Sequence, residues 1–460
     1  MNTACDYDVL VIGSGTAGQT AARELCGGGL AVGLVEHSDR PGGTCALRGC
    51  QAKKWFYEGA ALVALSRHLG GIGVTSPAIA KWSQLRDAKN AFTRGVPART
   101  VKGLERDGID VIKGRARFQS PRTLVVDDRP LSARFFVVAT GAAPLRLPID
   151  NAKTMISSER FMELETLPRR IVFVGGGFIS FEFAHFAARL GPEGTQGIIL
   201  EAGPRPLGPF DAEMVALLAE ASAADGIEVQ CNAEVSAIET VDSAYRVHTR
   251  DGRQFEADLV VNGAGRAAAI DDLGLERAQV DHSPEGIAVD AEMATTRPHI
   301  FAAGDCAATV QLARVADAEA KVAATNIRHT IQGRQERATI SYSAVPTVLF
   351  TYPQYGMVGA TESALKQDNV AYRKQFEKAL AWPTYRRVGL ETAAYKLLVG
   401  DDGQLLGAHM LSDHASGLIQ TFTLAMANRI PVTELYRQSV LTPYPSRESD
   451  LLYILASFSH

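Results

Sequence analysis

Residues 7–18 read YDVLVIGSGTAG. The short β-branched run at residues 7–12 predicts a buried strand, and the Ala-rich stretch at residues 16–25 predicts a helix. Between them lie Gly13, Gly15 and Gly18, spaced to make a tight turn, to admit a pyrophosphate and to let helix pack on strand. A second predicted strand, residues 31–35, ends at Glu36. An acid at this spacing accepts hydrogen bonds from a ribose, so the unit predicts a dinucleotide site.

The same pattern returns about 160 residues later. A predicted strand at residues 171–174 leads into GGGFIS, which carries Gly175 and Gly177 and has Ser180 in the third glycine position. The following strand, residues 197–200, ends at Glu201. Because a carboxylate there favours a free 2′-hydroxyl and repels a 2′-phosphate, we expect NADH over NADPH. Because Arg205 lies four residues further on, NADPH remains the alternative nucleotide.

Composition limits the classes of protein that the chain can be. The 460 residues carry a net charge of −4, which argues against a nucleic-acid partner, and predict about three domains. No apolar run reaches the length of a membrane span, and the acidic N-terminus is unlike a secretory signal, so we expect a cytoplasmic protein. Six cysteines in a chain of this length do not form a disulfide scaffold.

The segment PGGTCALRGC, residues 41–50, holds the one close pair of cysteines, Cys45 and Cys50. The spacing is poor for zinc and no further Cys or His pair stands near, so we expect no metal. Two readings remain: ordinary buried cysteines, or a redox disulfide in a distorted first helical turn, since a regular helix would not bring these sulfurs together.

Together these motifs resemble the pyridine nucleotide–disulfide oxidoreductases, the family of glutathione reductase, dihydrolipoamide dehydrogenase and mercuric reductase. The resemblance covers essentially the whole chain and includes ATG at residue 139, AGD at residues 303–305 and PTVLFTYP at residues 346–353. It implies an α/β fold with two Rossmann-like domains, for FAD and NAD(P), and a C-terminal α+β dimerisation domain. The implied segments are 1–148 and 269–338 for FAD, 149–268 for NAD(P)H and 339–460 for the homodimer interface.

The resemblance also implies roles for individual residues. Electrons would pass from NADH through FAD to a Cys45–Cys50 disulfide, with Cys45 attacking a sulfur-type or disulfide acceptor. Lys53 or Lys54 would lie near the flavin and pair with Glu182. The implied cofactor-binding residues are Gly13, Gly15, Gly18, Glu36, Gly43, Thr44, Ala116, Thr140, Gly141, Gly304, Asp305, Gly175, Gly177, Phe178, Ile179, Glu201 and Gly265.

The C-terminus departs from the family. Where relatives carry HPTxSE, whose histidine reaches the partner subunit's cysteines, this chain reads LTPYPSRES at residues 441–449. If Pro445 is aligned with the proline of that motif, Tyr444 falls in the histidine position. If Pro443 is aligned instead, Thr442 falls there. Glu448 lies near the position of the glutamate. Tyrosine is a poor base at neutral pH, so ordinary disulfide reduction should be slow unless Tyr444 donates a proton. His414 and His460 are the nearby spare histidines, and we expect structural or exposed roles for both.

Two other functions stay open. The flavin could reduce a quinone, dye or oxygen without the cysteines, or the chain could serve as a redox-sensing module that binds FAD and NADH. Retained turnover after loss of both cysteines would favour the first, and a stable protein partner with negligible turnover would favour the second.

Overall fold

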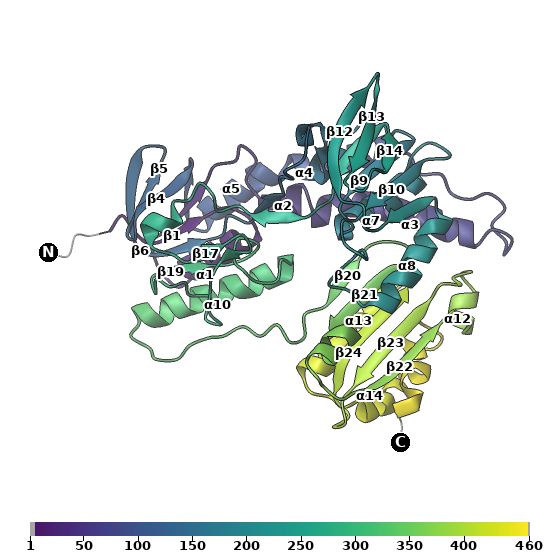
Figure 1. Ribbon diagram of the computed structural model, residues 1–460. Coiled ribbons are helices and arrows are strands. Elements are labelled where there is room, and N and C mark those ends of the chain that lie inside the picture. The colour runs from purple at the N-terminus through teal and green to yellow at the C-terminus, as the bar shows by residue number, and fades with distance from the viewer. Residues whose placement is uncertain (1–4, 459–460) are drawn as a thin grey trace. The chain divides into compact units, whose positions relative to one another are not determined.

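The computed structural model describes residues 5–458 (Figure 1). These residues form two compact units, each assembled from three separate segments of the chain. The first unit contains residues 5–54, 87–145 and 266–342, and the second contains residues 55–86, 146–265 and 343–458.

The first unit is built on a largely parallel sheet. Its strand order is β3-β2-β1-β6-β5-β4, with β19 pairing β6, and the pairs formed by β1, β2, β3, β6 and β19 are parallel. The strands are β1 (Tyr7–Ile12), β2 (Val32–Glu36), β3 (Asp110–Lys113), β4 (Ala116–Ser120), β5 (Thr123–Val126), β6 (Arg129–Val138) and β19 (Ile300–Ala302). A strand near the end of the chain's middle third therefore completes the sheet begun at the N-terminus.

Both faces of this sheet are buried. Val9 and Val11 point to one face, where helices α1 (Thr16–Cys26) and α10 (Ala313–Ile331) cover them. Leu10 and Ile12 point to the other face, into a second apolar cluster that includes residues of β4, β5 and α9 (Leu275–Ala278). Because successive strand side chains alternate, a strand apolar throughout must be covered on both sides.

The second unit repeats this architecture and adds an antiparallel sheet. Its parallel sheet has the order β11-β10-β9-β15-β8, and its antiparallel sheet has the order β20-β21-β24-β23-β22. Helices α7 and α8 accompany the parallel strands, and α13 packs on β21 and β24. The elements are β8 (Ile156–Ser157), β9 (Arg170–Val174), α7 (Phe178–Leu190), β10 (Gln196–Leu200), α8 (Ala212–Ala224), β11 (Ile227–Gln230), β15 (Leu259–Asn262), β20 (Thr347–Leu349), β21 (Gln354–Gly359), β22 (Arg373–Lys378), β23 (Ala394–Val399), β24 (Leu405–Ser412), α13 (Ala415–Ala427) and α14 (Val432–Ser439).

The remaining elements connect these sheets. They are α2 (Gly43–Leu47), α3 (Cys50–His68), α4 (Trp82–Arg94), α5 (Val96–Arg106), β7 (Ala142–Pro144), α6 (Ser158–Phe161), β12 (Val235–Val241), β13 (Ala244–Thr249), β14 (Gln254–Ala257), β16 (Arg266–Ala268), β17 (His282–Ser283), β18 (Gly286–Ile287), α11 (Glu362–Gln367), α12 (Pro383–Arg386) and α15 (Leu451–Leu455), with 3₁₀ turns at residues 152–154, 448–450 and 456–458. Residues 50–106 contain three of these helices, α3 to α5. The expected fold class is confirmed, whereas the four-segment division stays a prediction.

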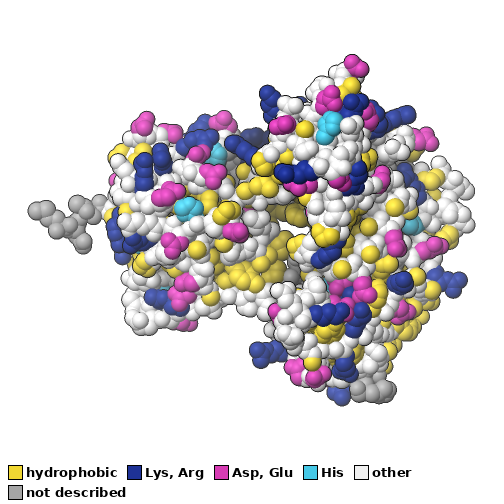
Figure 2. Space-filling view, viewed as in Figure 1, with side chains coloured by type: hydrophobic (Ala, Val, Ile, Leu, Met, Phe, Trp, Pro, Cys, Tyr) yellow, Lys and Arg dark blue, Asp and Glu magenta, His cyan; other side chains and the backbone are white. Residues whose placement is uncertain are grey.

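On the face seen in Figure 2, side chains of Lys and Arg are interspersed with those of Asp and Glu. Among the helices of residues 5–458, none is both long enough and apolar enough to cross a membrane.

Candidate functional site

The first glycine fingerprint forms an open backbone cradle at the start of α1. Gly15 is the N-cap of α1, no side chain caps this helix end, and its first turn holds no acid. A Cβ on Gly18 would lie 1.8 Å from the Gly13 carbonyl oxygen, so only glycine lets the helix approach the strand this closely. A Cβ on Gly15 would meet only Gly43 Cα, at 3.8 Å. The cradle is thus open towards the helix terminus, as a bound pyrophosphate requires.

Glu36 ties this cradle to the cysteine segment. Its carboxylate accepts hydrogen bonds from the backbone N–H of Ser14 at 3.0 Å and of Ser38 at 2.7 Å. The Ser14 hydroxyl donates to Glu36 and accepts from the N–H of Gly42 at 3.0 Å. The acid at the end of β2 is therefore held by the turn of the first fingerprint, and its role towards a ribose stays a prediction.

The second fingerprint has the same construction. Gly177 is the uncapped N-cap of α7, whose first turn also holds no acid. A Cβ on Gly175 would lie 2.4 Å from Ala264 Cα, whereas one on Gly177 would meet only the Gly263 carbonyl oxygen, at 3.6 Å. The Ser180 hydroxyl donates to the carbonyl of Gly175, so serine in the third position strengthens the turn.

Glu201 repeats the bonding of Glu36. It accepts hydrogen bonds from the N–H groups of Gly176 at 2.7 Å and Gly203 at 2.6 Å. The nearby Arg205 is committed to its own loop, because its guanidinium donates to the carbonyls of Leu207, Gly208 and Phe210.

The two cysteines lie on either side of a break between helices. Cys45 is on α2, which ends at Leu47, and Cys50 is the first residue of α3. Both are thiols, and the Cys45 side chain lies within hydrogen-bonding reach of Cys50. The bond to Cys50 and burial raise the pKa of the Cys45 thiol. The sequence led us to expect a distorted first turn, whereas the structure breaks the helix entirely between the sulfurs.

The cysteine segment packs directly on the first fingerprint. A Cβ on Gly43 (φ +75°) would lie 2.4 Å from Gly15 Cα, so glycine is required at position 43. The Cys45 side chain also contacts the Thr16 hydroxyl in the first turn of α1. The sulfurs therefore lie beside the cradle within the same compact unit.

Further polar residues of the first unit surround this segment. Arg266 donates to the Ala142 carbonyl at 2.5 Å and to the Thr44 hydroxyl at 3.4 Å. Gly304 adopts φ +78° and donates its N–H to buried Glu319 at 2.7 Å. Burial raises the pKa of Asp305, and the nearby Arg266 charge offsets only part of that rise.

The other expected site residues lie in both units. In the first unit, Ala116 begins β4, Thr140 and Gly141 follow β6, and Lys53 and Lys54 lie on α3. In the second unit, Gly265 adopts φ +108°, Phe178 is exposed, Ile179 is buried, and buried Glu182 accepts a hydrogen bond from the Phe350 N–H at 3.0 Å. The pairing of Glu182 with either lysine stays a prediction.

The C-terminal segment presents a pair that the sequence register did not indicate. Tyr444 is 81% exposed, and the Thr442 hydroxyl donates to the Ser439 carbonyl at 2.8 Å. Glu448 Oε1 instead lies 3.0 Å from Nε2 of His414, the N-cap residue of α13. No signal in the sequence joins residues 34 positions apart in this way. His460 lies outside the described residues.

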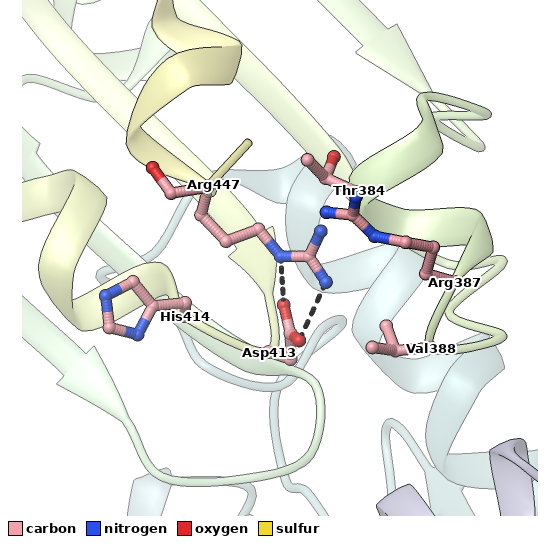
Figure 3. Close-up of a pocket in the computed structure, with 7 residues that line it drawn as sticks. Thr384, Arg387, Val388, Asp413, His414 and Arg447 are labelled. Atoms are coloured by element: carbon pink, nitrogen blue, oxygen red, sulfur yellow. Dashed lines mark hydrogen bonds and ion pairs between the residues drawn. The ribbon is translucent and has the colours of Figure 1, made fainter. Parts of the chain in front are cut away.

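This pair borders a pocket of about 350 Å³ (Figure 3). His414 lies on one side of an Arg447–Asp413 ion pair, and Arg387 and Thr384 lie on the other. Arg447 donates to Asp413 through Nε at 2.7 Å and Nη2 at 2.8 Å, and its guanidinium stacks on the Tyr385 ring. The pocket is lined by Thr384, Arg387, Val388, Asp413, His414, Ser446 and Arg447.

Comparison with known proteins identifies the class. Residues 7–320 match the pyridine nucleotide-disulphide oxidoreductase family, and residues 345–450 match the dimerisation domain of that family. The chain therefore belongs to the pyridine nucleotide-disulphide oxidoreductases. The family supports FAD, a pyridine nucleotide and a disulfide redox centre for this chain, and its dimerisation domain supports a homodimer.

Particular relatives span nearly the full chain. A glutathione reductase of Burkholderia cepacia is 33% identical over 92% of this chain and 93% of its own length. A dihydrolipoyl dehydrogenase of Chlamydia pneumoniae is 31% identical over 94% of this chain and 93% of its own length. A solved structure, the HOCl-induced flavoprotein disulfide reductase RclA from Escherichia coli, is 25% identical, with a TM-score of 0.86 over 98% of this chain and 99% of that chain.

Proposed function

We propose that this protein transfers electrons from NADH, through FAD and the Cys45–Cys50 pair, to a disulfide or other sulfur-type acceptor. The observation that carries the proposal is the contact of the two thiols at a helix break, packed against the first fingerprint. Cysteines that only filled a core would need neither the break nor the approach of Gly43 to Gly15. The protein would act as a homodimer, and a cytoplasmic location stays a prediction.

The residues of the first unit fit FAD. The uncapped end of α1 offers N–H groups to a pyrophosphate, Glu36 is oriented for a ribose, and Asp305 follows β19 where it can hold the ribityl chain. Bound FAD would supply two-electron transfer between the pyridine nucleotide and the disulfide.

The chemistry of the cysteines follows thiol–disulfide exchange. The Cys45 thiolate attacks one sulfur of the acceptor and displaces the other as a thiolate. Cys50 then attacks Cys45, which releases the second thiolate and re-forms the Cys45–Cys50 disulfide. Because the bond to Cys50 and burial raise the pKa of Cys45, attack by Cys45 first requires its proton to pass to the neighbouring Cys50 thiolate, so the pair loses its two protons one at a time.

The preference for NADH rests on the loop that follows β10. Glu201 presents a carboxylate held by two backbone N–H groups, and a 2′-phosphate beside it would meet like charge. Arg205, the candidate phosphate ligand, already donates to three carbonyls. Binding of Arg205 to a 2′-phosphate would break those three hydrogen bonds.

The test compares two acceptors with NADH as donor. We expect the double variant Cys45→Ser/Cys50→Ser to keep FAD and reduction of a dye such as dichlorophenolindophenol, and to lose reduction of 5,5′-dithiobis(2-nitrobenzoate). Cys26→Ser, whose sulfur only bonds the Asp107 carbonyl, is the matched control. Undiminished reduction of the disulfide by the double variant would exclude the cysteine relay.

A further inference from the structure

The proposed function leaves open which acceptors Cys45 can attack, and a carboxylate of the first unit bears on that choice. Asp317 lies on α10, the helix that packs against α1 (Figure 1). Its side chain is 24% exposed, so the carboxylate meets solvent as well as α1. The cysteine relay itself gives this charge no use.

One hydrogen bond fixes Asp317 against α1. The Thr20 hydroxyl donates to Asp317 Oδ1 at 2.7 Å. The second oxygen, Oδ2, accepts a hydrogen bond from Arg314 Nη1 at 2.9 Å, in an i, i+3 pair on the same helix. Because the Arg314 side chain is 95% exposed, solvent screens this ion pair and the arginine compensates the carboxylate only weakly. Asp317 is therefore held in place by α1 and can attract a positive charge that approaches from solvent.

The same edge of α1 contacts the cysteines. Thr16 lies one helical turn before Thr20, so the two side chains share one face of the helix, with β-carbons about 5–6 Å apart. Because the Thr16 hydroxyl contacts the Cys45 side chain, Asp317 lies about one helical turn from the sulfur. All four residues belong to the first unit, and all four are partly exposed. They therefore form one accessible strip along which an acceptor of Cys45 can lie.

The charge of Asp317 also acts on the thiol itself. The bond to Cys50 and burial raise the pKa of Cys45, and the Asp317 carboxylate raises it further. Arg266 also contacts the cysteine segment, but its charge acts on Asp305. A positive group bound at Asp317 would cancel the effect of the carboxylate and favour the Cys45 thiolate. A negative group in the same place would meet a like charge.

We propose that Asp317, held by Thr20, determines the specificity of the acceptor site and selects disulfides with a positive charge close to the sulfur–sulfur bond; this inference rests on the proposed function. The acceptor is thus an amine-bearing or otherwise basic disulfide, and anionic disulfides are disfavoured. The cationic group pairs with Asp317 while the Cys45 thiolate attacks the nearer sulfur and the other sulfur leaves as a thiolate. Attack by Cys50 releases the second thiolate. NADH supplies the electron pair and one of the two protons that the product thiols take up, and solvent supplies the other.

The first test measures Cys45 without turnover. In a Cys50→Ser background, the rate of Cys45 alkylation by anionic iodoacetate is divided by the rate with neutral iodoacetamide. Both reagents react with the same thiolate, so the ratio reports the charge that the reagent meets. We expect Asp317→Asn to raise this ratio by about 3- to 5-fold at low ionic strength, and salt at about 1 M to remove the difference. Asp317→Glu keeps the charge and should restore most of the original ratio.

The second test measures acceptor preference in turnover with NADH. Cystamine, a dication, is compared with 3,3′-dithiodipropionate, a dianion; both are alkyl disulfides, so neither has the easily displaced thiolate of an aromatic disulfide. We expect the wild type to prefer cystamine and Asp317→Asn to lower the ratio of the two kcat/KM values by about 10-fold. Asp8→Asn is the matched control, because Asp8 also bonds one arginine, Arg134, at 2.9 Å and is 27% exposed, but lies at the end of β1 away from the fingerprint. It should change neither ratio.

Each outcome decides between the alternatives. An unchanged turnover ratio in Asp317→Asn would overturn the inference, whatever the alkylation result. Equal losses with both disulfides would overturn it as well, because the carboxylate would then only support the packing of α10 on α1. Failure of the proposed function looks different: both disulfides would be reduced without the cysteines or not at all, while the alkylation ratio would still respond to Asp317→Asn. That result would overturn the relay and the acceptor class together.

Discussion

The replacement Glu201→Gln tests the proposed preference for NADH. The carboxylate accepts two short backbone N–H bonds, at 2.7 and 2.6 Å, and is oriented for a ribose by both. Hydrogen bonds to a charged group contribute about 1.5–3 kcal/mol, against about 0.5–1.5 kcal/mol for neutral partners. Loss of the charge should therefore weaken the use of NADH by about 1–2 kcal/mol, or roughly 5- to 30-fold in kcat/KM.

The same change should favour NADPH. A carboxylate beside a 2′-phosphate costs on the order of 1–4 kcal/mol, depending on how far solvent screens the pair. Together the two effects should lower the ratio of kcat/KM for NADH to that for NADPH by at least about 30-fold. Glu220→Gln, on the exposed side of α8, is the matched control.

The assay is dye reduction at varied NADH and NADPH, because it does not depend on the identity of the natural acceptor. Equal losses with both nucleotides would mean that Glu201 only supports the loop. A wild type that prefers NADPH would refute the assignment of Arg205 to its loop carbonyls.

Three further predictions concern the cofactor and stability. Gly18→Ala places a Cβ 1.8 Å from the Gly13 carbonyl, so the purified protein should lack flavin absorbance near 450 nm, whereas Gly208→Ala, with open space around it, should retain it. Burial lowers the pKa of His409 to about 4, so its neutral form stabilises the fold above the unfolded pKa near 6.5, and about 2 kcal/mol is lost as the pH falls to 5. Thermal unfolding of His409→Gln should show a smaller drop between pH 7 and pH 5; an equal drop would contradict this. Lys396 is fully buried and bonds Asp211, Glu213 and Glu362, so Lys396→Met should destabilise the protein by about 3–5 kcal/mol at pH 7, with partial recovery near pH 4 as the carboxylates become protonated. Equal losses at both pH values, measured by urea unfolding, would refute that reasoning.

Local sequence determined most of the fold. Glycine spacing, β-branched runs and terminal acids act over fewer than 40 residues, so both fingerprints and their strands were predictable, and Glu36 and Glu201 were found at the ends of β2 and β10. The sequence assigned each acid to a ribose, whereas only the structure shows that each carboxylate also accepts hydrogen bonds from backbone N–H groups of the preceding turn and of the loop that follows. The spacing of Cys45 and Cys50 left their pairing open, because the break at Arg48 and Gly49 that permits their contact was not visible in the sequence.

Tertiary structure alone decided the pairing of His414 with Glu448. When the C-terminal segment is aligned with the HPTxSE motif of relatives, Tyr444 or Thr442 falls in the histidine position, and neither alignment places a histidine there. The folded chain instead brings the N-terminus of α13 beside the turn that precedes α15, and Gly417 leaves the room for the ring. Contacts between residues far apart in sequence depend on how the sheet and helices pack, and no local pattern of residues encodes that packing.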